Sequence, residues 1–470
     1  MLYKTYASEL SALIDSGALK AGQRMPSVRE ASRHRGLSVM TVLKAYHWLE
    51  ARGLIVARTR SGYYVSSQSR AYPPQPQVSQ PELRSTAVNK SDFIFEVLDA
   101  LRQGVVVPLG SAFPSPLQFP LPQLYRSLSR SMRNLDPWRT MSDLAPGNLE
   151  LRRQIALRYH IDGMEIAPEE LVITDGAMEA LNLCLQAVTR PGDAVVIESP
   201  TFYVALQALE RLGLRAIEVA THPVDGIDLA ALETALREHR PAACWLMPNF
   251  QNPLGALMPD DKKQKLVEML EQYAVPMIED DVYGELYYAS TRPKPAKAYD
   301  RSGNVLHCSS FSKCLAPGYR IGWAAPGRFA GAVQRLKLGT SLSAAVPSQL
   351  ALADYLAGAG YDRHLRQLRD ALFVERDAMI AMIKEYFPQG TRVTRPEGGY
   401  FLWLELPPGT DSLKLHRLAL NQGISIAPGA IFSAGDDFNH CIRINYGHPD
   451  DKRTVRALKT LGGLAIEAKN

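Results

Sequence analysis

The sequence lacks the features that send a chain into or across a membrane. No apolar run approaches the roughly 18 to 20 residues that a membrane-spanning helix needs. The first residues, MLYK, do not begin the apolar core of a signal peptide, which argues against export and predicts a cytoplasmic protein. A composition of 46% hydrophobic and 21% charged residues is typical of soluble globular domains, and 470 residues are too many for one ordinary domain.

Cysteine is also scarce. The five cysteines include no C-x-x-C pair and are scattered along the chain, at Cys184, Cys244, Cys308, Cys314 and Cys441. This spacing argues against a disulfide framework or a zinc site, so we expect no metal. Unpaired cysteines fit a reducing cytoplasm.

Positive charge is concentrated at the N-terminus. Residues 1–70 hold eleven lysines and arginines against four acidic residues, a net charge of +7, whereas the remaining 400 residues together carry −2. A basic segment joined to a nearly neutral body favours a partner that carries phosphates. Taken alone, this charge is equally consistent with a solvated basic surface.

The basic segment has the pattern of a helix-turn-helix. Ser27 and Glu30 form a capping box at the start of a predicted helix, Gly36 ends it, and Ser38 is a suitable N-cap for the next helix. In that next helix, apolar residues recur at i, i+3, i+4 and i+7, at positions 42, 45, 46 and 49. The opposite face, with Lys44 among its polar residues, is therefore free to enter a DNA groove.

A short hairpin is predicted to follow. Residues 53–57 and 63–65 have strand character, and the turn between them, 58–62, is basic. Such a wing can place an arginine beside the DNA backbone or in a narrow minor groove. A generic three-helix scaffold with a hairpin is the simpler alternative.

The rest of the chain predicts a larger α/β domain. Residues 67–90 are rich in Ser, Gln and Pro and are interpreted as an extended linker between domains 1–66 and 91–470. Beyond them, strand-like runs alternate with amphipathic helices, at 171–174, 194–198, 244–247, 275–279 and 305–308. This alternation is typical of an α/β fold with a mostly parallel sheet.

One motif in this domain suggests a lysine that reacts with a carbonyl. Lys313 lies in the pattern S-x-S-K-x-x-x-P-G-x-R-x-G, which begins at Ser310 and follows a predicted strand. A lysine amine is the group that forms a Schiff base with a cofactor aldehyde. The hydroxyls of Ser310 and Ser312 and the guanidinium of Arg320 are suited to a phosphate.

Residues upstream could hold the ring of such a cofactor. Asp280 ends an apolar strand and can pair with a pyridine nitrogen, which keeps the ring an electron sink. Tyr283 and Asn252 can donate hydrogen bonds to the ring's phenolic oxygen. Phe202 can stack on the ring, although a core position is a reasonable alternative. Standing alone, the stretch around Asn252 would be interpreted as a plain turn.

Two further segments suit anions. The amides of Gly176, Ala177 and Met178 follow a strand and open a helix, where they could point at a phosphate. Arg443 lies on an apolar strand, and a buried arginine needs a partner such as a substrate carboxylate.

The N-terminal segment resembles the GntR family of winged-helix regulators. The matching stretches are MPSVR at 25–29, LSVMTV at 37–42, AYHWLE at 45–50 and SGYYV at 61–65. The resemblance implies binding to double-stranded DNA. It implies that the contacts come from Arg29, from the start of the third helix and from the wing, that is from Ser38, Met40, Thr41, Arg60 and Gly62.

Residues from about 105 to 470 resemble the fold-type-I pyridoxal phosphate enzymes, the aspartate-aminotransferase-like superfamily. The resemblance implies a large subdomain at about 120–330 and a smaller C-terminal α/β subdomain at about 360–470. Carried over by motif, Lys313 is the catalytic lysine that binds the cofactor. Asp280 is the partner of the ring nitrogen, and the other residues named above keep the roles given there, with Arg443 for the substrate carboxylate.

The union of these two parts resembles the MocR subfamily of regulators. The resemblance implies a homodimer that binds an operator and senses an amino acid, an amine or the cofactor through aldimine exchange at Lys313. Related dimers often place the head of one chain against the body of the other. Two departures from the family pattern are Leu144, where many relatives have a tyrosine that reaches the partner's phosphate, and Met178, where many have a polar residue.

Two other functions remain open from the sequence. The chain carries every catalytic residue type, so a working aminotransferase with a winged-helix head, or a regulator with weak or half-transamination activity, is an alternative. A DNA-organising protein with an inactive body explains the intact cofactor motifs less well. The effector, the operator and the direction of regulation do not follow from the sequence.

Overall fold

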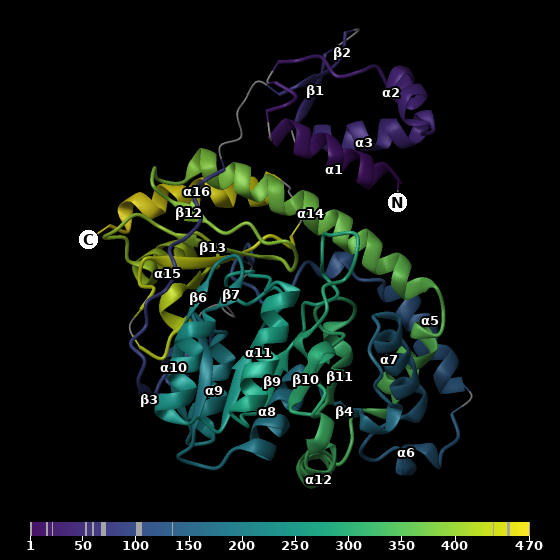
Figure 1. The fold of residues 1–470 in the computed structure, drawn as a ribbon, viewed down its shortest axis with the longest axis vertical. Helices are drawn as coiled ribbons and strands as arrows, with labels where there is room; N and C mark the ends of the chain where they lie inside the picture. The colour runs from purple at the N-terminus through teal and green to yellow at the C-terminus, as the bar shows by residue number, and fades with distance from the viewer. Residues whose placement is uncertain are drawn as a thin grey trace.

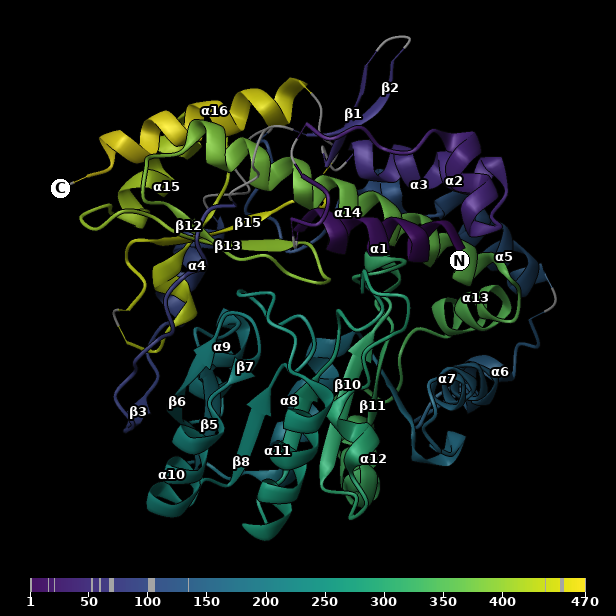
Figure 2. The same ribbon diagram turned by 45° about the horizontal axis from the view of Figure 1, so that its top comes forward.

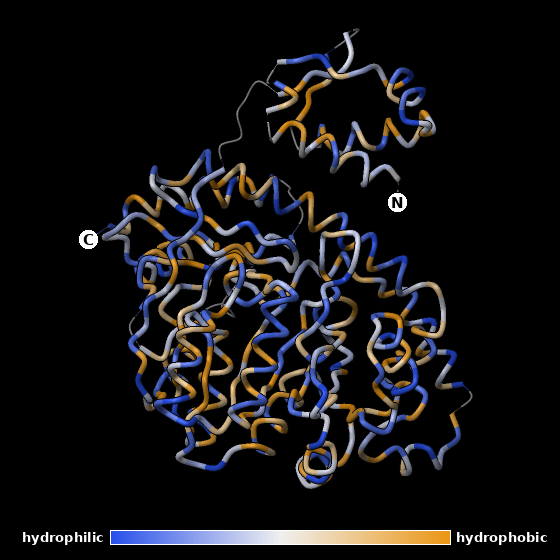
Figure 3. Tube along the Cα trace, viewed as in Figure 1, coloured by the Kyte–Doolittle hydropathy of each residue, from blue (hydrophilic) through white to orange (hydrophobic). Residues whose placement is uncertain are grey.

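The computed structural model describes residues 2–15, 17–20, 22–51, 54–58, 61–66, 72–99, 106–133, 135–435, 437–448 and 452–469. They form a small N-terminal head and a large body (Figures 1 and 2). Figure 3 shows hydrophobic stretches along the central strands of the body. No helix in these residues has both the length and the apolar character needed to cross a bilayer.

The head has the predicted helix-turn-helix and wing. Its elements are α1 (Leu2–Asp15), α2 (Val28–Arg35), α3 (Val39–Ala51), β1 (Ile55–Arg58) and β2 (Gly62–Val65). The capping box is confirmed, because Ser27 Oγ accepts from Glu30 N and Glu30 accepts from Ser27 N. Gly36 ends α2 with a φ of 63°, which favours glycine. The predicted apolar face of α3 is buried in a core of the head's own.

The wing is an antiparallel pair in which Ile55 lies opposite Val65. Residues 59 and 60 of its turn, and therefore the predicted contact Arg60, lie outside the described residues. Arg58 stacks over Tyr64, 4.3 Å from the ring centroid, which holds one cation of the turn against the hairpin.

The body is built on a mixed, mostly parallel sheet in the order β3-β6-β5-β8-β9-β10-β11-β4. The strands β6, β5, β8, β9 and β10 pair in parallel, while β11 and β3 run the opposite way. β4 runs in the same direction as β10, because both pair antiparallel with β11. The strands are β3 (Ser85–Ala87), β4 (Val172–Thr174), β5 (Ala194–Ser199), β6 (Arg215–His222), β7 (Gly226–Ile227), β8 (Ala243–Leu246), β9 (Met277–Asp280), β10 (Val305–Ser310) and β11 (Gly322–Ala325).

These strands confirm the predicted α/β class, and each of the five predicted runs overlaps one of them. The strands are short and buried because both faces of the sheet are covered by helices (Figure 1). The helices of this part are α4 (Ser91–Asp99), α5 (Leu121–Arg133), α6 (Arg139–Ser142), α7 (Leu149–Ile161), α8 (Ala177–Val188), α9 (Tyr203–Arg211), α10 (Leu229–His239), α11 (Asp260–Gln272), α12 (Ala330–Ser341) and α13 (Val346–Leu356).

The C-terminal part has its own antiparallel sheet, in the order β12-β13-β15-β14. It contains α14 (Gly360–Tyr386), β12 (Arg392–Val393), β13 (Phe401–Glu405), α15 (Ser412–Asn421), β14 (Ala427–Pro428), β15 (Cys441–Asn445) and α16 (Lys452–Glu467). The long helix α14 runs along the side of the body that faces the head (Figures 1 and 2).

The described part of the predicted linker, residues 72–90, is attached to the body. Val393 N donates to Pro74 O at 2.9 Å, and Gln77 N donates to Glu405 Oε2 at 2.7 Å. Strand β3 then pairs with the edge strand β6. The exact domain boundaries remain predictions.

Candidate functional site

A cavity of about 230 Å³ lies at the ends of β9 and β10, beside the start of α8. Strand ends are where ligands bind in sheets of this kind, because the loops that follow parallel strands meet at one edge. Its lining includes nine predicted residues, which are Lys313, Asp280, Tyr283, Phe202, Ala177, Met178, Ser310, Ser312 and Arg320. These nine residues are spread over about 140 positions of the sequence, and the fold brings them together.

Lys313 presents its amine to this cavity. Nζ donates to Ala112 O at 2.8 Å and lies 3.9 Å from the centroid of the Phe113 ring. Burial, with the charge of Arg443 second, lowers the pKa of Lys313 to about 7, although Asp280 opposes this shift. A large fraction of the amine is therefore uncharged at neutral pH, as a nucleophile must be.

Asp280 is the buried acid of the cavity. Its Oδ1 has no hydrogen-bond partner among the described residues. Burial raises the pKa of this carboxyl group to about 7. An unpaired buried carboxylate oxygen costs free energy unless a donor fills its place, and a protonated ring nitrogen is such a donor. This atom therefore fits the pyridine ring of pyridoxal phosphate.

Arg443 and Asn252 close another part of the site. Arg443 Nη1 donates to Asn252 Oδ1 at 3.1 Å, and Nη2 donates to Gly110 O at 2.8 Å. Asn252 Nδ2 lies 3.4 Å from Tyr283 Oη. The guanidinium is buried, its Nε has no partner, and among the described residues it forms no ion pair with a carboxylate. A buried cation of this kind fits a ligand anion.

The phosphate cradle is formed by Arg320 and the turn before α8. Arg320 Nη1 donates to Ser312 Oγ at 3.2 Å, and Nη2 donates to Asp175 O at 3.0 Å. A Cβ on Gly176, whose φ is 82°, would overlap the Arg320 guanidinium, so the turn requires glycine. Gly176 N donates to Thr174 O, so this amide, which was predicted to face a phosphate, already has an acceptor. The amides of Ala177 and Met178 open α8, and the first amides of a helix have no acceptor within it, so these two remain suited to an anion.

Several residues of the site were missed from sequence. Ala112 and Phe113 contact Lys313, although they precede it by about 200 residues in the sequence. Tyr203 lines the cavity next to Phe202. No local pattern marks these contacts, because they depend on how the N-terminal loop of the body packs. The alternation of side chains at a strand end could have separated Asp280 from its neighbour Asp281.

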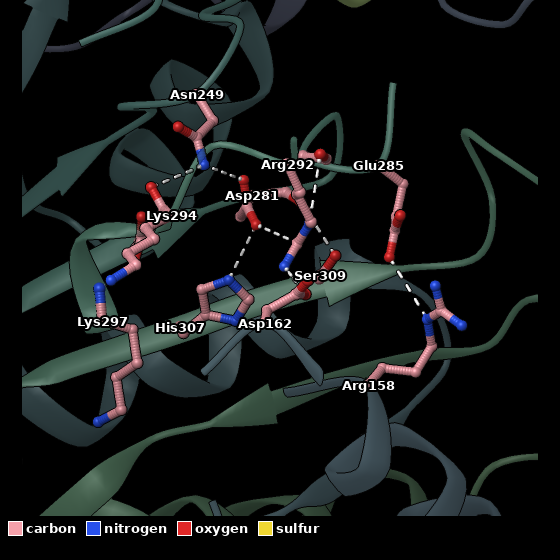
Figure 4. Close-up of polar contacts among 12 residues, drawn as sticks. Arg158, Asp162, Asn249, Asp281, Glu285, Arg292, Lys294, Lys297, His307 and Ser309 are labelled. Carbon is pink, nitrogen blue, oxygen red and sulfur yellow. Dashed lines mark hydrogen bonds and ion pairs between the residues drawn. The ribbon is translucent and has the colours of Figure 1, made fainter. Parts of the chain in front are cut away.

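Asp281 belongs to a buried polar cluster rather than to the cavity (Figure 4). It accepts hydrogen bonds from His307 Nε2 at 3.1 Å, Arg292 Nη2 at 3.0 Å and Asn249 Nδ2 at 3.0 Å. Burial raises the pKa of this carboxyl group, but the bond from His307 and the charge of Arg292 outweigh burial, so the pKa is lowered. The ionised Asp281 fixes the end of β9, where Asp280 lies.

Of the two departures from the family pattern, Met178 lines the cavity, and Leu144 is an exposed residue outside the cavity lining. Met178 is consistent with a role for its amide alone.

The predicted DNA contacts of the head lie on its surface. Arg29, Ser38, Met40, Lys44 and Gly62 are exposed. Thr41 is half-buried, and its N donates to the capping oxygen Ser38 Oγ at 3.0 Å. Arg24, which the sequence did not single out, is exposed and lies against Gly62 at the base of the wing.

Two family profiles match the chain. Residues 2–65 match "Bacterial regulatory proteins, gntR family", and residues 140–461 match "Aminotransferase class I and II". The two matches correspond to the head and to most of the body.

Full-length relatives share both parts. The uncharacterized HTH-type transcriptional regulator YdcR of Escherichia coli strain K12 is 49% identical over 465 residues, and 99% of each chain is covered. The uncharacterized HTH-type transcriptional regulator YjiR of the same organism is 36% identical, again over 99% of each chain.

The body is also similar to solved structures. The α-aminoadipate aminotransferase LysN of Thermus thermophilus, solved in complex with N-(5'-phosphopyridoxyl)-L-leucine, superimposes with a TM-score of 0.72 at 29% identity. The match covers 80% of this chain and 94% of that one. The predicted fold of the body is therefore confirmed.

Proposed function

This chain belongs to the MocR-like GntR regulators, in which a gntR-type head precedes an aminotransferase-like, pyridoxal-phosphate-binding body, and from this premise we propose that it is a ligand-responsive transcription regulator. The head binds double-stranded DNA. The body senses an amino acid or amine at Lys313. The observation that carries the proposal is that one site holds the half-buried amine of Lys313 and two buried atoms without a partner among the described residues, Asp280 Oδ1 and Arg443 Nε, in a chain with a gntR-type head.

Each group of residues at the site has a separate role. Asp280 holds the proton of the ring nitrogen, Tyr283 and Asn252 orient the ring, and Arg320 with Ser312 binds the phosphate. When bound, the cofactor would supply an aldehyde carbon that can bond either to Lys313 Nζ or to a ligand amine. A ligand carboxylate is bound by Arg443.

The DNA-binding side follows from the exposed face of the head. Met40, which is 60% exposed, and Lys44 lie on the surface of α3, and Arg29 lies near the start of α2. In helix-turn-helix proteins the second helix of the motif enters the major groove, so α3 reads bases while the basic residues bind phosphates.

We also propose that the chain forms a homodimer. Large apolar side chains are exposed around α5, α6 and the end of α12, including Leu117 at 87%, Trp138 at 74% and Met141 at 68%. Ala145 N donates to Leu342 O, which brings another exposed leucine beside this region. Exposed apolar groups of this size are typical of a protein interface. Two heads would then read two half-sites.

A working aminotransferase is the second candidate. It is favoured by the same Lys313 amine, whose pKa of about 7 suits a catalyst, and by the likeness to aminotransferase structures. Both functions use the same site, so only turnover and DNA response separate them.

Borohydride trapping tests the site directly. The purified holoprotein should be yellow, and reduction should fix the cofactor on Lys313, as located by peptide mass mapping. Lys313→Ala should lose both signals, whereas Lys265→Ala, at an exposed lysine on α11, should keep them. Trapping on another lysine would show that the site is assigned wrongly.

DNA binding is tested by selecting bound fragments from a genomic pool. Log affinity for the selected DNA should fall steeply with log salt concentration, because phosphate contacts release counterions. Residues 90–470 alone should not bind. Equal binding by this fragment would refute the role of the head.

A further inference from the structure

The head is tied closely to its own body. The last described residue of the head, Ser66, is separated from Tyr72 by only five residues, and Tyr72 lies under the Arg395 guanidinium at 3.9 Å. The next residues are bonded to β12 and β13 through Pro74 and Gln77. Six residue steps span at most about 20 Å. The head is therefore held within about 20 Å of Tyr72.

An aromatic contact joins the two parts. Trp48 of α3 stacks on Phe373 of α14, with ring centroids 5.7 Å apart and an angle of 7° between the planes. Tyr3 of α1 lies near Asp370, whose charge, after burial, raises the pKa of the Tyr3 hydroxyl. Figure 2 shows α1 and α3 alongside α14.

The contact leaves the DNA-binding face free. Trp48 is half-buried, but Met40, Lys44 and His47 on the same helix are exposed. A head docked through Trp48 can therefore still present α3 to DNA, and the dock sets the direction in which α3 points. A cavity of about 780 Å³ lies between head and body, so the junction is incompletely filled.

Phe373 is linked to the cofactor site by a short series of contacts. Its ring lies 5.5 Å from that of Tyr288, edge to face. Tyr288 Oη donates to Gly399 O and contacts Tyr446 Oη at 2.8 Å. The neighbouring Tyr400 donates to Ala112 O at 3.1 Å, which is the same carbonyl that accepts from Lys313 Nζ. Few residues thus separate the reactive amine from the dock.

We propose that each head docks on α14 of its own chain through the Trp48–Phe373 stack, and that this dock carries the state of Lys313 to the orientation of α3. The inference rests on the proposed function. A change in the bonding of Lys313 alters its hold on Ala112 O, which Tyr400 shares. Gly399 and Tyr288 pass the shift to Phe373, and the docked head turns with it. Coupling of this kind requires that the two states of the site differ in their contacts, and the loss or gain of the Lys313 hydrogen bond to Ala112 O would be such a difference.

Cross-linking tests which body the head occupies. Thr5 of α1 and Val374 of α14 line the junction cavity, and all five native cysteines are buried. In full-length holoprotein, Thr5→Cys with Val374→Cys should therefore join through a flexible bis-maleimide within one chain. The product should run at the mass of a single chain, and adding Trp48→Ala should reduce its yield. A two-chain product would show docking on the partner's body, and no product would show that the head is not docked; either result overturns the proposal.

The coupling is tested with Trp48→Ala and Trp48→Phe. The probe is the standard L-amino acid that gives the largest absorbance change in wild-type holoprotein. If this amino acid changes operator affinity 5- to 150-fold in the wild type, Trp48→Ala should reduce the change to less than about 2-fold, and Trp48→Phe should retain most of it. The absorbance change at the cofactor should persist in both variants, because neither touches the site.

The outcomes separate the role of the dock from the proposed function as a regulator. An unchanged response in Trp48→Ala would refute the role of the dock while leaving the regulator intact. No response in the wild type would count against the proposed function, whereas the cross-link would still decide where the head lies. Phe373→Leu, which keeps an apolar side chain at this buried position, guards against a variant that merely fails to fold.

Discussion

Replacing Arg443 tests how the site recognises a ligand. The guanidinium is buried, two of its nitrogens donate to Asn252 Oδ1 and Gly110 O, and its Nε has no partner among the described residues. The centroid of the Phe401 ring lies 4.1 Å from Arg443 Cζ, so water competes weakly for the remaining N–H donors of Arg443. Arg443→Ala should therefore weaken binding of ligands that carry a carboxylate much more than binding of simple amines.

The magnitude follows from the hydrogen bonds lost. A hydrogen bond to a charged group contributes about 1.5–3 kcal/mol, and a guanidinium can offer two such bonds to a carboxylate, about 3–6 kcal/mol together. Because about 1.4 kcal/mol corresponds to a tenfold change, affinity for an amino acid should fall roughly 10²- to 10⁴-fold. The same substitution also leaves Gly110 O without its donor, and this cost is shared by every ligand.

Absorbance titration of the holoprotein with phenylalanine and with 2-phenylethylamine separates these effects. The amine lacks the carboxylate, so its affinity should change only by the shared cost. Arg417→Ala, at an exposed arginine on α15, is the matched control and should change neither titration. Equal losses for the two ligands in Arg443→Ala, or no loss for phenylalanine, would refute the assignment of the carboxylate to Arg443.

Three further predictions concern the cofactor and the DNA. Capture of pyridoxal phosphate by apoprotein should speed up as pH rises through about 7, because the lowered pKa of Lys313 makes the free amine predominate above that pH; a rate that rises only near pH 10 in stopped-flow absorbance would contradict this. Gly176→Ala should weaken cofactor affinity at least about 10-fold by displacing Arg320, whereas Gly318→Ala, where a Cβ has open space, should not; equilibrium dialysis measures both. Thr41→Ala should reduce the ratio of operator to non-specific affinity more than it reduces non-specific affinity in gel-shift titrations.

The sequence predicts the head and the cofactor residues well because both are local. The capping box at Ser27 and the glycine at position 36 act within a few residues, and the structure forms both. The motif around Lys313 is local in the same way, because its residues lie at the end of one strand and in the turn that follows. Spacing along the chain is enough to place such residues, because they share an element.

Contacts between distant segments could not be predicted. The acceptor of Lys313 is Ala112, which lies in a loop that packs beside the cavity only in the folded body. The neighbours Asp280 and Asp281 look alike in sequence, but the strand directs one to the cavity and the other to His307 and Arg292. The dock between head and body has no sequence signal, since a half-exposed aromatic residue on a helix is common.

The most direct test of the central claim is the affinity of full-length holoprotein for its selected DNA, measured by fluorescence anisotropy with and without each standard amino acid. A regulator predicts that at least one of them changes the affinity about 5- to 150-fold, or changes the bend of the DNA, while the protein shows no sustained turnover. Turnover of amino donors at about 1–10³ per second, with DNA affinity unchanged by every ligand and by the cofactor, would contradict the account and leave an aminotransferase.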